Sequence, residues 1–282
     1  MTTTTQQHQL ERPGSTRRRM SPRRRARISR GIQYGVLLVA VVVVAFATDW
    51  ARVGTSFFNP TVAREMLPSL GGALRNTVVY TIAAFAVGLS LGTVLALMRL
   101  STVRAYRWIA TVYIEFFRGI PALLVVLTIG FAVPIAFDVQ ISSVTTKVAI
   151  ALGMVSAAYI AETLRAGIQA VPRGQVEAAR SLGMSHSRTL AVVVIPQAFR
   201  IVLPPMTNEV ILLTKDTSLV FLLGLGTAQY ELTKIGREAL TNATGGLTGL
   251  FVVGACYLCL TIPLGLLARW LENRSSGKGR RA

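Results

Sequence analysis

Residues 171–196 read VPRGQVEAARSLGMSHSRTLAVVVIP, and the stretch changes from polar to apolar partway along. Pro172 suits the first turn of a helix, and the Glu-Ala-Ala run that follows favours helix. Gly183 is a typical stop at a helix C-terminus. A second helical stretch begins at Ser185 and continues into apolar sequence. We therefore predict a short amphipathic helix, a stop, and then a helix that runs into a membrane.

Apolar runs flank this stretch and recur along the chain. Hydrophobic residues make up 52% of the 282-residue sequence and charged residues 15%, whereas soluble proteins carry roughly 25% charged residues. A bilayer core requires about 20 apolar residues in a helix. The sequence predicts six membrane spans, at Gly31–Thr48, Asn76–Leu97, Ala110–Phe137, Val148–Ile168, Leu190–Leu213 and Leu247–Leu267.

The charge distribution predicts the orientation of these spans. The net charge is +18, which would suit a nucleic-acid partner, but nine arginines fall in residues 12–30 and five Lys or Arg in residues 269–281. Basic segments beside apolar runs mark the cytoplasmic side of a membrane protein. We therefore predict no nucleic-acid partner, but a multi-pass protein of the cell membrane in contact with the lipid bilayer. Both termini are expected to be cytoplasmic, with residues 49–75, 138–147 and 214–246 outside.

The two ends of the chain have a different composition from the rest. Residues 1–30 are predicted to form a basic, disordered cytoplasmic tail, followed by an extra N-terminal transmembrane helix at 31–48. A cleaved signal peptide that ends near Ala45-Phe46-Ala47 is an alternative, although the apolar run is longer than the usual length of about 7–15 residues. Residues 272–282 are predicted to be a second basic cytoplasmic tail.

The spacing in the opening stretch resembles the EAA loop of ABC importer permeases, E-A-A-x3-G-x9-I-x-L-P. The pattern is matched in order, with two conservative replacements, by Glu177, Ala178, Ala179, Gly183, Val193, Ile195 and Pro196, and Gly174 just ahead of it also fits. The resemblance implies that residues 172–190 are a cytoplasmic coupling loop that docks on a separate ATPase. There the acidic residue would pair with a basic group of the ATPase, and the two alanines would allow close approach.

Other motifs resemble the polar amino-acid permeases of the histidine/glutamine/arginine/glutamate/opine group. EFFRGIP at 115–121 resembles E-x-x-R-G-T-P with Ile120 in place of Thr, and AAYIAETLRAG at 157–167 matches A-A-Y-x-x-E-x-x-R-x-G. The resemblance implies that residues 71–271 are an ABC importer transmembrane domain with a five-helix core. The implied fold class is an all-α membrane protein of about six transmembrane helices, a type I ABC importer permease with one extra N-terminal span.

The function that this resemblance implies is that of a permease subunit in an ATP-driven importer. A polar amino acid would be delivered by an extracellular or periplasmic binding protein. The chain contains no G-x-x-x-x-G-K-[ST] motif, so no cofactor is expected on it, and ATP and Mg²⁺ would bind to a partner dimer of ABC ATPase subunits. A second permease subunit, identical or homologous, would complete the pathway. No catalytic residue and no metal site are expected.

Charged residues inside apolar runs are candidates for function because they are costly to bury in a membrane. Two pairs are spaced i,i+3 and can neutralise each other on one helix face, and a third pair consists of adjacent residues near an outer end. Structural pairing is the first interpretation, and gating or interface roles are the alternatives. The three pairs are Glu115 with Arg118, Glu162 with Arg165, and Lys215 with Asp216.

A substrate pathway is expected deep in the fifth span. Asn208 and Glu209 follow two prolines that loosen the helix, and the carboxylate could receive an ammonium group. Tyr159 is a further candidate, with packing as the equal alternative. Cys256 and Cys259 are expected to pack in the core.

Two alternatives to amino-acid import remain at this point. The same architecture could serve an opine or a compatible solute, because the coupling chemistry would be identical and only the cavity would differ. An ion-coupled secondary transporter would work without ATP and would not depend on Glu177 or Gly183. A membrane anchor without transport does not account for the charges and prolines within the spans.

Overall fold

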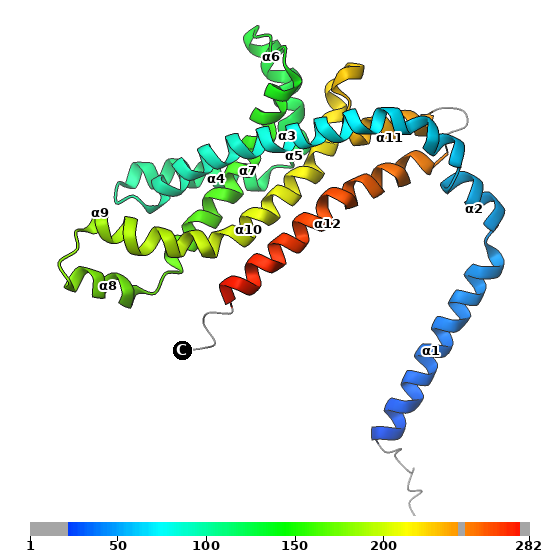
Figure 1. Cartoon of the computed structure of the whole chain (residues 1–282), viewed down its shortest axis with the longest axis horizontal. Helices are drawn as coiled ribbons and strands as arrows, with labels where there is room; N and C mark the ends of the chain where they lie inside the picture. The colour runs from blue at the N-terminus through cyan, green and yellow to red at the C-terminus, as the bar shows by residue number, and fades with distance from the viewer. Residues whose placement is uncertain (1–21, 242–245, 277–282) are drawn as a thin grey trace, which may run out of the picture. The chain divides into compact units, whose positions relative to one another are not determined.

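The computed structural model describes residues 22–241 and 246–276, and in these ranges the regular structure is entirely helical. The chain divides into two compact units, residues 1–53 and 54–282, with the boundary inside one short helix. Figure 1 labels the elements. The long helices are α1 (Pro22–Ala47), α3 (Pro60–Leu100), α4 (Arg104–Gly119), α7 (Val144–Gln169), α10 (Ile195–Asp216) and α12 (Thr248–Ser276). The short ones are α2 (Trp50–Phe57), α5 (Ala122–Leu127), α6 (Val133–Phe137), α8 (Arg173–Ser181), α9 (His186–Thr189) and α11 (Leu232–Thr241).

Four further turns complete the chain. Two are π-helical, η1 (Thr128–Ala132) and η2 (Leu190–Val194), and two are 3₁₀-helical, η3 (Thr217–Leu223) and η4 (Thr227–Gln229). The π turn η2 ends two residues before Pro196, whose ring nitrogen cannot donate a helical hydrogen bond. The helix then continues through Pro204 and Pro205, so the proline pair that was expected to loosen it does not interrupt it.

The first unit contains α1, which begins earlier than the sequence predicted. The helix starts at Pro22, so residues 22–30 are helical and the prediction of a disordered tail up to residue 30 is wrong for them. Arginine is a good helix former, and proline is well tolerated at the first helical position. The rest of that tail, residues 1–21, lies outside the described residues. At the other end of the chain α12 continues to Ser276, so the first residues of the predicted C-terminal tail are also helical.

The second unit is built around α7, which is the most deeply buried of its long helices. The backbones of α3 and α7 approach closely because small residues face each other. A Cβ atom on Gly92 would lie 2.9 Å from the carbonyl oxygen of Ala157, and one on Gly153 would lie 2.8 Å from Cβ of Val87. Small residues permit such close contacts between membrane helices. The tight α3–α7 pair therefore forms the centre of the unit, against which α4 and α10 pack.

The third predicted span, Ala110–Phe137, is not one helix. Helix α4 ends at Gly119, and the segment from Ala122 to Phe137 leaves it at an angle of 103°. Ile120 has an extended backbone, with φ −102° and ψ 140°, because it precedes Pro121. Five helices are long and apolar enough to cross a membrane in the described ranges, and the bent pair makes a sixth if it is counted as one span.

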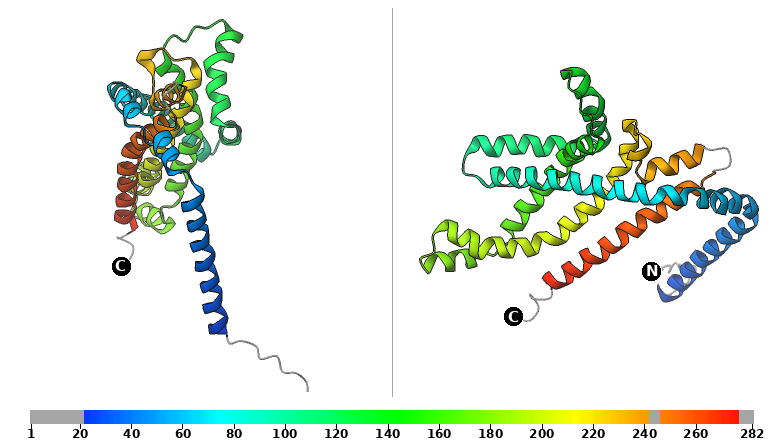
Figure 2. Two further views of the ribbon diagram at one scale, coloured as in Figure 1. Left: turned by 90° about the vertical axis from the view of Figure 1, so that its right-hand side faces the viewer. Right: turned by 45° about the horizontal axis from the view of Figure 1, so that its top comes forward.

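The segment predicted as an outer loop, 214–246, is helical over much of its length. It contains the end of α10, both 3₁₀ turns and α11, which packs on α3 and α12. The amide of Asn76 on α3 holds this segment in place by donating to the carbonyl oxygens of Ala228 at 3.0 Å and Tyr230 at 2.8 Å. In Figures 1 and 2, α8 and α9 lie at one end of the second unit and α11 near the other.

The carboxyl group of Glu231 caps the start of α11 and is fully buried. Its two oxygens accept hydrogen bonds from the backbone N–H groups of Thr233 at 2.6 Å and Lys234 at 2.8 Å, and Tyr257 on α12 donates a third at 3.2 Å. Burial raises the pKa of Glu231 above its usual value, because desolvation outweighs these hydrogen bonds. The cap joins α11 to α12.

Candidate functional site

The predicted coupling loop, residues 172–190, has the local structure that its sequence indicated. Pro172 immediately precedes α8, which ends at Ser181, and Gly183 has φ +81°. The side chain of Ser185 caps α9 by accepting from the backbone N–H of Arg188. A left-handed residue after a helix is the usual place for glycine. These local predictions are confirmed.

Hydrogen bonds within the loop fix the reversal between α8 and α9. The N–H of Gly183 donates to the carbonyl oxygen of Arg180 at 3.0 Å, and the N–H of Met184 donates to that of Ala179 at 3.2 Å. The guanidinium of Arg180 donates in turn to the carbonyl oxygen of Met184 at 2.6 Å. The loop is therefore a closed structure whose shape depends on the positive φ at Gly183.

One face of α8 rests on its own chain and the other is exposed. Gly174, Glu177 and Ala178 are exposed, whereas Ala179 is 6% exposed and faces inward. Of the two alanines expected to permit close approach to an ATPase, only Ala178 is therefore accessible. Leu182, which the sequence analysis did not single out, is 84% exposed just after the helix. An apolar side chain that protrudes from a polar loop suits a protein contact.

An apolar cluster joins the coupling loop to the long helices. Its buried members are Val171, Val194 and Ala198, and Ile168, Val176 and Leu190 pack against them. These residues come from the end of α7, from α8, and from the start of the α9–α10 segment. A displacement of α8 would therefore move the ends of both α7 and α10, because packed side chains transmit movement.

Besides this apolar cluster, a cluster of polar residues connects three helices. Arg165 contacts Glu162 at 2.6 Å on α7, which is the pair that the i,i+3 spacing suggested. Arg99 on α3 also contacts Glu162, at 3.5 Å, and donates to the hydroxyl of Thr111 on α4 at 2.6 Å. We call Arg99, Thr111, Glu162 and Arg165 the Glu162 cluster. The contribution of Arg99 has no local signal in the sequence, because it lies 63 positions from Glu162.

The other two predicted ion pairs do not form within the described residues. Glu115 and Arg118 are both exposed, and the Arg118 guanidinium lies instead over the ring of Tyr159, 5.8 Å from its centroid. Lys215 and Asp216 do not pair either, because adjacent positions of a helix point in different directions. Opposite charges close in sequence were therefore not sufficient for pairing.

The three candidates for the substrate pathway lie on two helices. Asn208 is exposed and Glu209 is half-buried on α10, whereas Tyr159 is exposed on α7. No hydrogen bond joins any two of them in the part of the chain that the structure describes. The proposed pathway therefore rests on Glu209 as a half-buried carboxylate within a membrane span.

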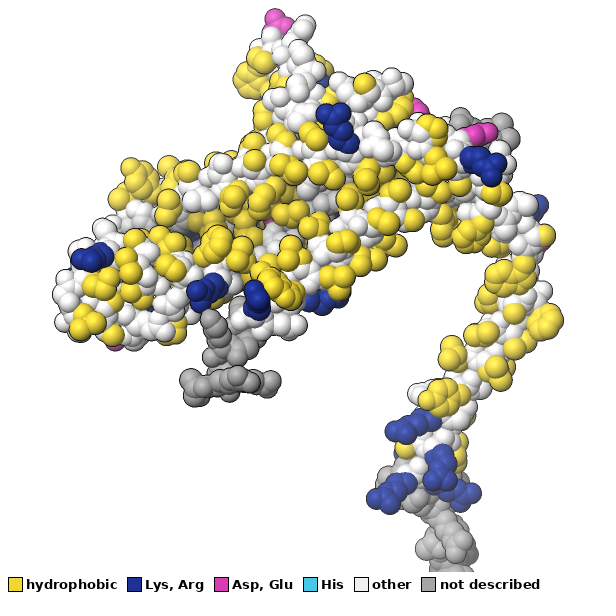
Figure 3. All heavy atoms as spheres, in the orientation of Figure 1, with side chains coloured by type: hydrophobic (Ala, Val, Ile, Leu, Met, Phe, Trp, Pro, Cys, Tyr) yellow, Lys and Arg dark blue, Asp and Glu magenta, His cyan; other side chains and the backbone are white. Residues whose placement is uncertain are grey.

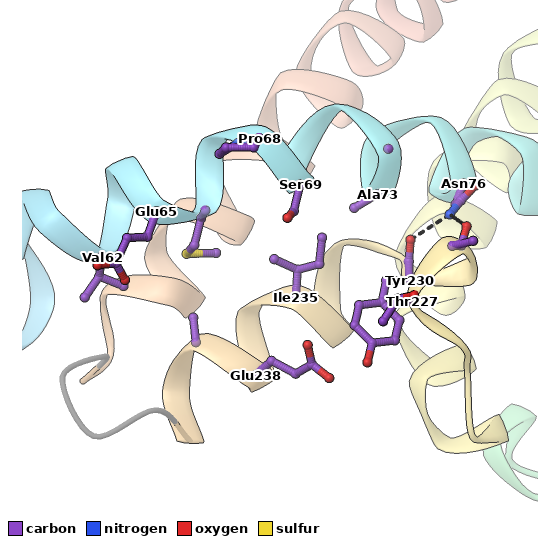
Figure 4. A pocket seen from close by; sticks show the side chains of 14 residues that line it. Val62, Glu65, Pro68, Ser69, Ala73, Asn76, Thr227, Tyr230, Ile235 and Glu238 are labelled. Carbon is purple, nitrogen blue, oxygen red and sulfur yellow. Dashed lines mark hydrogen bonds between the residues drawn. The ribbon is translucent and has the colours of Figure 1, made fainter.

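The structure contains a pocket that the sequence analysis did not predict. It lies between α3 and the η4–α11 segment and has a volume of about 460 Å³. Figure 4 shows Glu65 and Ser69 on the α3 side, and Tyr230 and Glu238 on the other. Glu238 pairs with Lys234 at 3.3 Å. This α3–α11 pocket joins segments about 150 residues apart, so no local motif could have indicated it.

Comparisons with known proteins agree on one family. Residues 88–277, more than half of the chain, match the family described as binding-protein-dependent transport system inner membrane component. The L-cystine transport system permease protein TcyB of Bacillus subtilis is 40% identical, and the match covers 78% of this chain and 92% of TcyB. The arginine transport system permease protein ArtQ of Bacillus subtilis is 33% identical, with coverage of 77% and 96%. The glutamate/aspartate import permease protein GltK of Escherichia coli O6:H1 is 34% identical, with coverage of 74% and 95%.

Solved structures give the same fold. A crystal structure of an amino acid ABC transporter with histidines has 34% identity and a TM-score of 0.68, covering 74% of this chain and 95% of the other. The MetNI methionine ABC transporter in an inward-facing conformation has 20% identity and a TM-score of 0.54, covering 73% and 95%. The second likeness concerns the fold alone.

Proposed function

We infer the function from the premise that this chain belongs to the family of binding-protein-dependent transport system inner membrane components. It is a multi-pass membrane protein with the type I ABC importer permease fold, and it is the membrane-spanning permease subunit of an ATP-driven importer for a polar amino acid. It is not an enzyme, since ATP is hydrolysed by a separate subunit. The family match over residues 88–277 carries this inference, and no observation favours an ion-coupled carrier or an opine permease.

The coupling loop is the proposed contact with the ATPase. Glu177, Ala178 and Leu182 offer an acidic, a small and an apolar side chain on the exposed side of the loop. ATP and Mg²⁺ bind to the ATPase dimer in this proposal, and closure of that dimer shifts α8. The apolar cluster at Val171 and Val194 passes the shift to α7 and α10, which biases the permease between inward and outward states.

The orientation follows from the loop. If the coupling loop faces the ATPase, both termini are cytoplasmic and the α3–α11 pocket opens on the outer side. A binding protein would deliver its amino acid at that side, and a second permease subunit, identical or homologous, would enclose the pathway. Glu209, with Asn208 beside it, is the proposed group that receives the substrate ammonium inside the membrane.

Reconstitution tests the pathway and the coupling loop separately. The chain is placed in liposomes with its ATPase and binding protein, and uptake of a panel of labelled amino acids is measured with ATP or a non-hydrolysable analogue inside. Glu209→Gln should change KM or substrate choice, because it removes the charge that meets the ammonium group. Glu177→Gln is the matched control and should lower the maximal rate with KM unchanged. Uptake without ATP would contradict the function, and an unchanged KM in Glu209→Gln across the panel would contradict the pathway.

A further inference from the structure

A groove between α10 and α12 lies outside the coupling loop, the Glu162 cluster and the α3–α11 pocket. Its volume is about 660 Å³. The α10 wall comes from the first turns of that helix, residues 197–203, and the α12 wall from residues 270–274 near its end. Apolar side chains dominate the lining, and its charged members are Arg200 and Arg274. We call this the α10–α12 groove.

In the proposed orientation, the groove lies at the cytoplasmic edge of the membrane. The α10 wall begins only a few residues after the coupling loop, and the α12 wall comes directly before the basic C-terminal end of the chain. Trp270 is half-exposed at the α12 wall, and tryptophan is enriched where the bilayer meets water. Figure 3 shows basic side chains along the lower edge of the second unit, with hydrophobic side chains above them.

The charge in the groove has one sign and comes from both walls. Arg200 projects from α10 and Arg274 from α12, and neither wall contributes an acidic lining residue. The Arg274 guanidinium stacks on the ring of Trp270, 4.1 Å from its centroid, which holds it at the groove. Beside these arginines the lining is largely apolar, with Ile201, Leu203 and Leu271.

Such a lining complements a ligand with an anionic head and an apolar body. Two other ligands fit the groove less well. A free phosphate would leave the apolar side chains of the groove uncovered. A zwitterionic amino acid would also leave them uncovered, and its single carboxylate would leave one arginine without a partner. Basic pockets between membrane helices on the cytoplasmic side are the type of site that binds anionic lipid headgroups. Arginine pairs with phosphate through two parallel hydrogen bonds, which favours it for this purpose.

We propose that the α10–α12 groove binds an anionic phospholipid of the cytoplasmic leaflet. Arg200 and Arg274 bind its phosphate from opposite walls, and its acyl chains lie along Ile201, Leu203 and Leu271. The lipid contacts the first turns of α10, which the coupling loop displaces, so a bound lipid holds α10 against α12. This site is separate from the amino-acid pathway, and its place in the cytoplasmic leaflet rests on the proposed function.

Native mass spectrometry of the full chain in detergent tests the site directly. Phosphatidylglycerol and phosphatidylcholine with identical acyl chains are added at matched concentrations, and bound lipid is counted. The double variant Arg200→Gln with Arg274→Gln should bind phosphatidylglycerol roughly 30-fold more weakly than the unmodified chain. Arg269→Gln is the matched control, because Arg269 is exposed on α12 but does not line the groove. Arg200→Lys with Arg274→Lys keeps both charges and should retain most of the binding.

A photo-crosslinking amino acid at Leu271 identifies what occupies the groove in membranes. A lipid adduct that is lost in the double glutamine variant supports the proposal. A crosslinked dimer of this chain, or an adduct with the ATPase, would overturn it by showing that a protein covers the groove. Equal binding of the two lipids, or equal phosphatidylglycerol binding by the double variant and the unmodified chain, would also overturn it. Import can proceed normally in either case, so failure here does not test the proposed function.

Discussion

Gly183→Ala tests whether the shape of the coupling loop matters for transport. Gly183 has φ +81°, and a Cβ atom added there would meet nothing within 4 Å. The substitution is therefore unfavourable in this chain only because of the left-handed backbone, whose free-energy cost is roughly 1–2 kcal/mol for an L-residue with a side chain. That cost reduces the population of the native loop about 5- to 30-fold relative to alternatives that relieve the strain.

The assay is ATP-dependent uptake by liposomes that contain the chain, its ATPase and its binding protein. Gly183→Ala should lower the uptake rate by up to about 5- to 30-fold, while the amount of chain in the membrane stays the same. Asparagine tolerates positive φ better than alanine, so the uptake rate should fall less in Gly183→Asn than in Gly183→Ala, despite the larger side chain of asparagine.

Gly254→Ala is the matched control for this experiment. Gly254 lies inside α12, has the same open space around its Cβ position and has no positive φ, so uptake should not fall. Normal uptake in Gly183→Ala would refute the reasoning. Equal losses in the alanine and asparagine variants would also refute it, because side-chain bulk rather than backbone conformation would then be responsible.

Three further predictions concern stability and are measured by thermal unfolding in detergent. Arg99→Gln removes the ion pair that joins α3 to α7 and the hydrogen bond that joins α3 to α4, so it should lower the free energy of unfolding by about 1–3 kcal/mol. A loss of stability no larger than that of the exposed control Arg104→Gln would contradict this prediction. Asn76→Ala removes two hydrogen bonds to the segment before α11 and should lower the free energy of unfolding by about 2 kcal/mol. The control Ser69→Ala, in the same pocket, should lower it by less than about 0.5 kcal/mol. Similar losses of stability in the two variants would argue against the role of the Asn76 amide. The pKa of Glu231 is raised in the folded state, so protonation of this carboxyl group favours folding. The free energy of unfolding should therefore fall as the pH rises from about 4.3, the pKa of Glu in the unfolded chain, through the higher pKa of Glu231 in the folded chain. Glu231→Gln should lack that fall, and parallel pH profiles would contradict it.

The coupling loop was predictable because its signals are local. Pro172, Gly183 and Ser185 are respectively suited to a helix start, a left-handed stop and a helix cap, and each acts within a few residues. Tertiary contacts did not need to override these preferences. The bend at Pro121 also has a local cause, and a run of 28 residues exceeds what a single straight span requires.

Features that depend on packing between distant segments were not predictable from one sequence. Spacing suggested Arg165 as the partner of Glu162, but Arg99 comes from another helix and no pattern links the two. The same spacing suggested a pair between Glu115 and Arg118, yet the guanidinium of Arg118 lies over the ring of Tyr159 on α7. Spacing of i,i+3 on a helix surface permits two side chains to contact each other. Side chains of the neighbouring helix then determine whether that contact forms or another one replaces it.

The central claim is that this chain works with a separate ATPase through the coupling loop. Purification of the chain from its native host in a mild detergent, followed by mass spectrometry of the proteins that accompany it, tests this claim most directly. We predict a P-loop ATPase in stoichiometric amount with the unmodified chain and a marked loss of that ATPase with Gly183→Leu. A chain that purifies without an ATPase and transports its substrate in liposomes without ATP would contradict the claim.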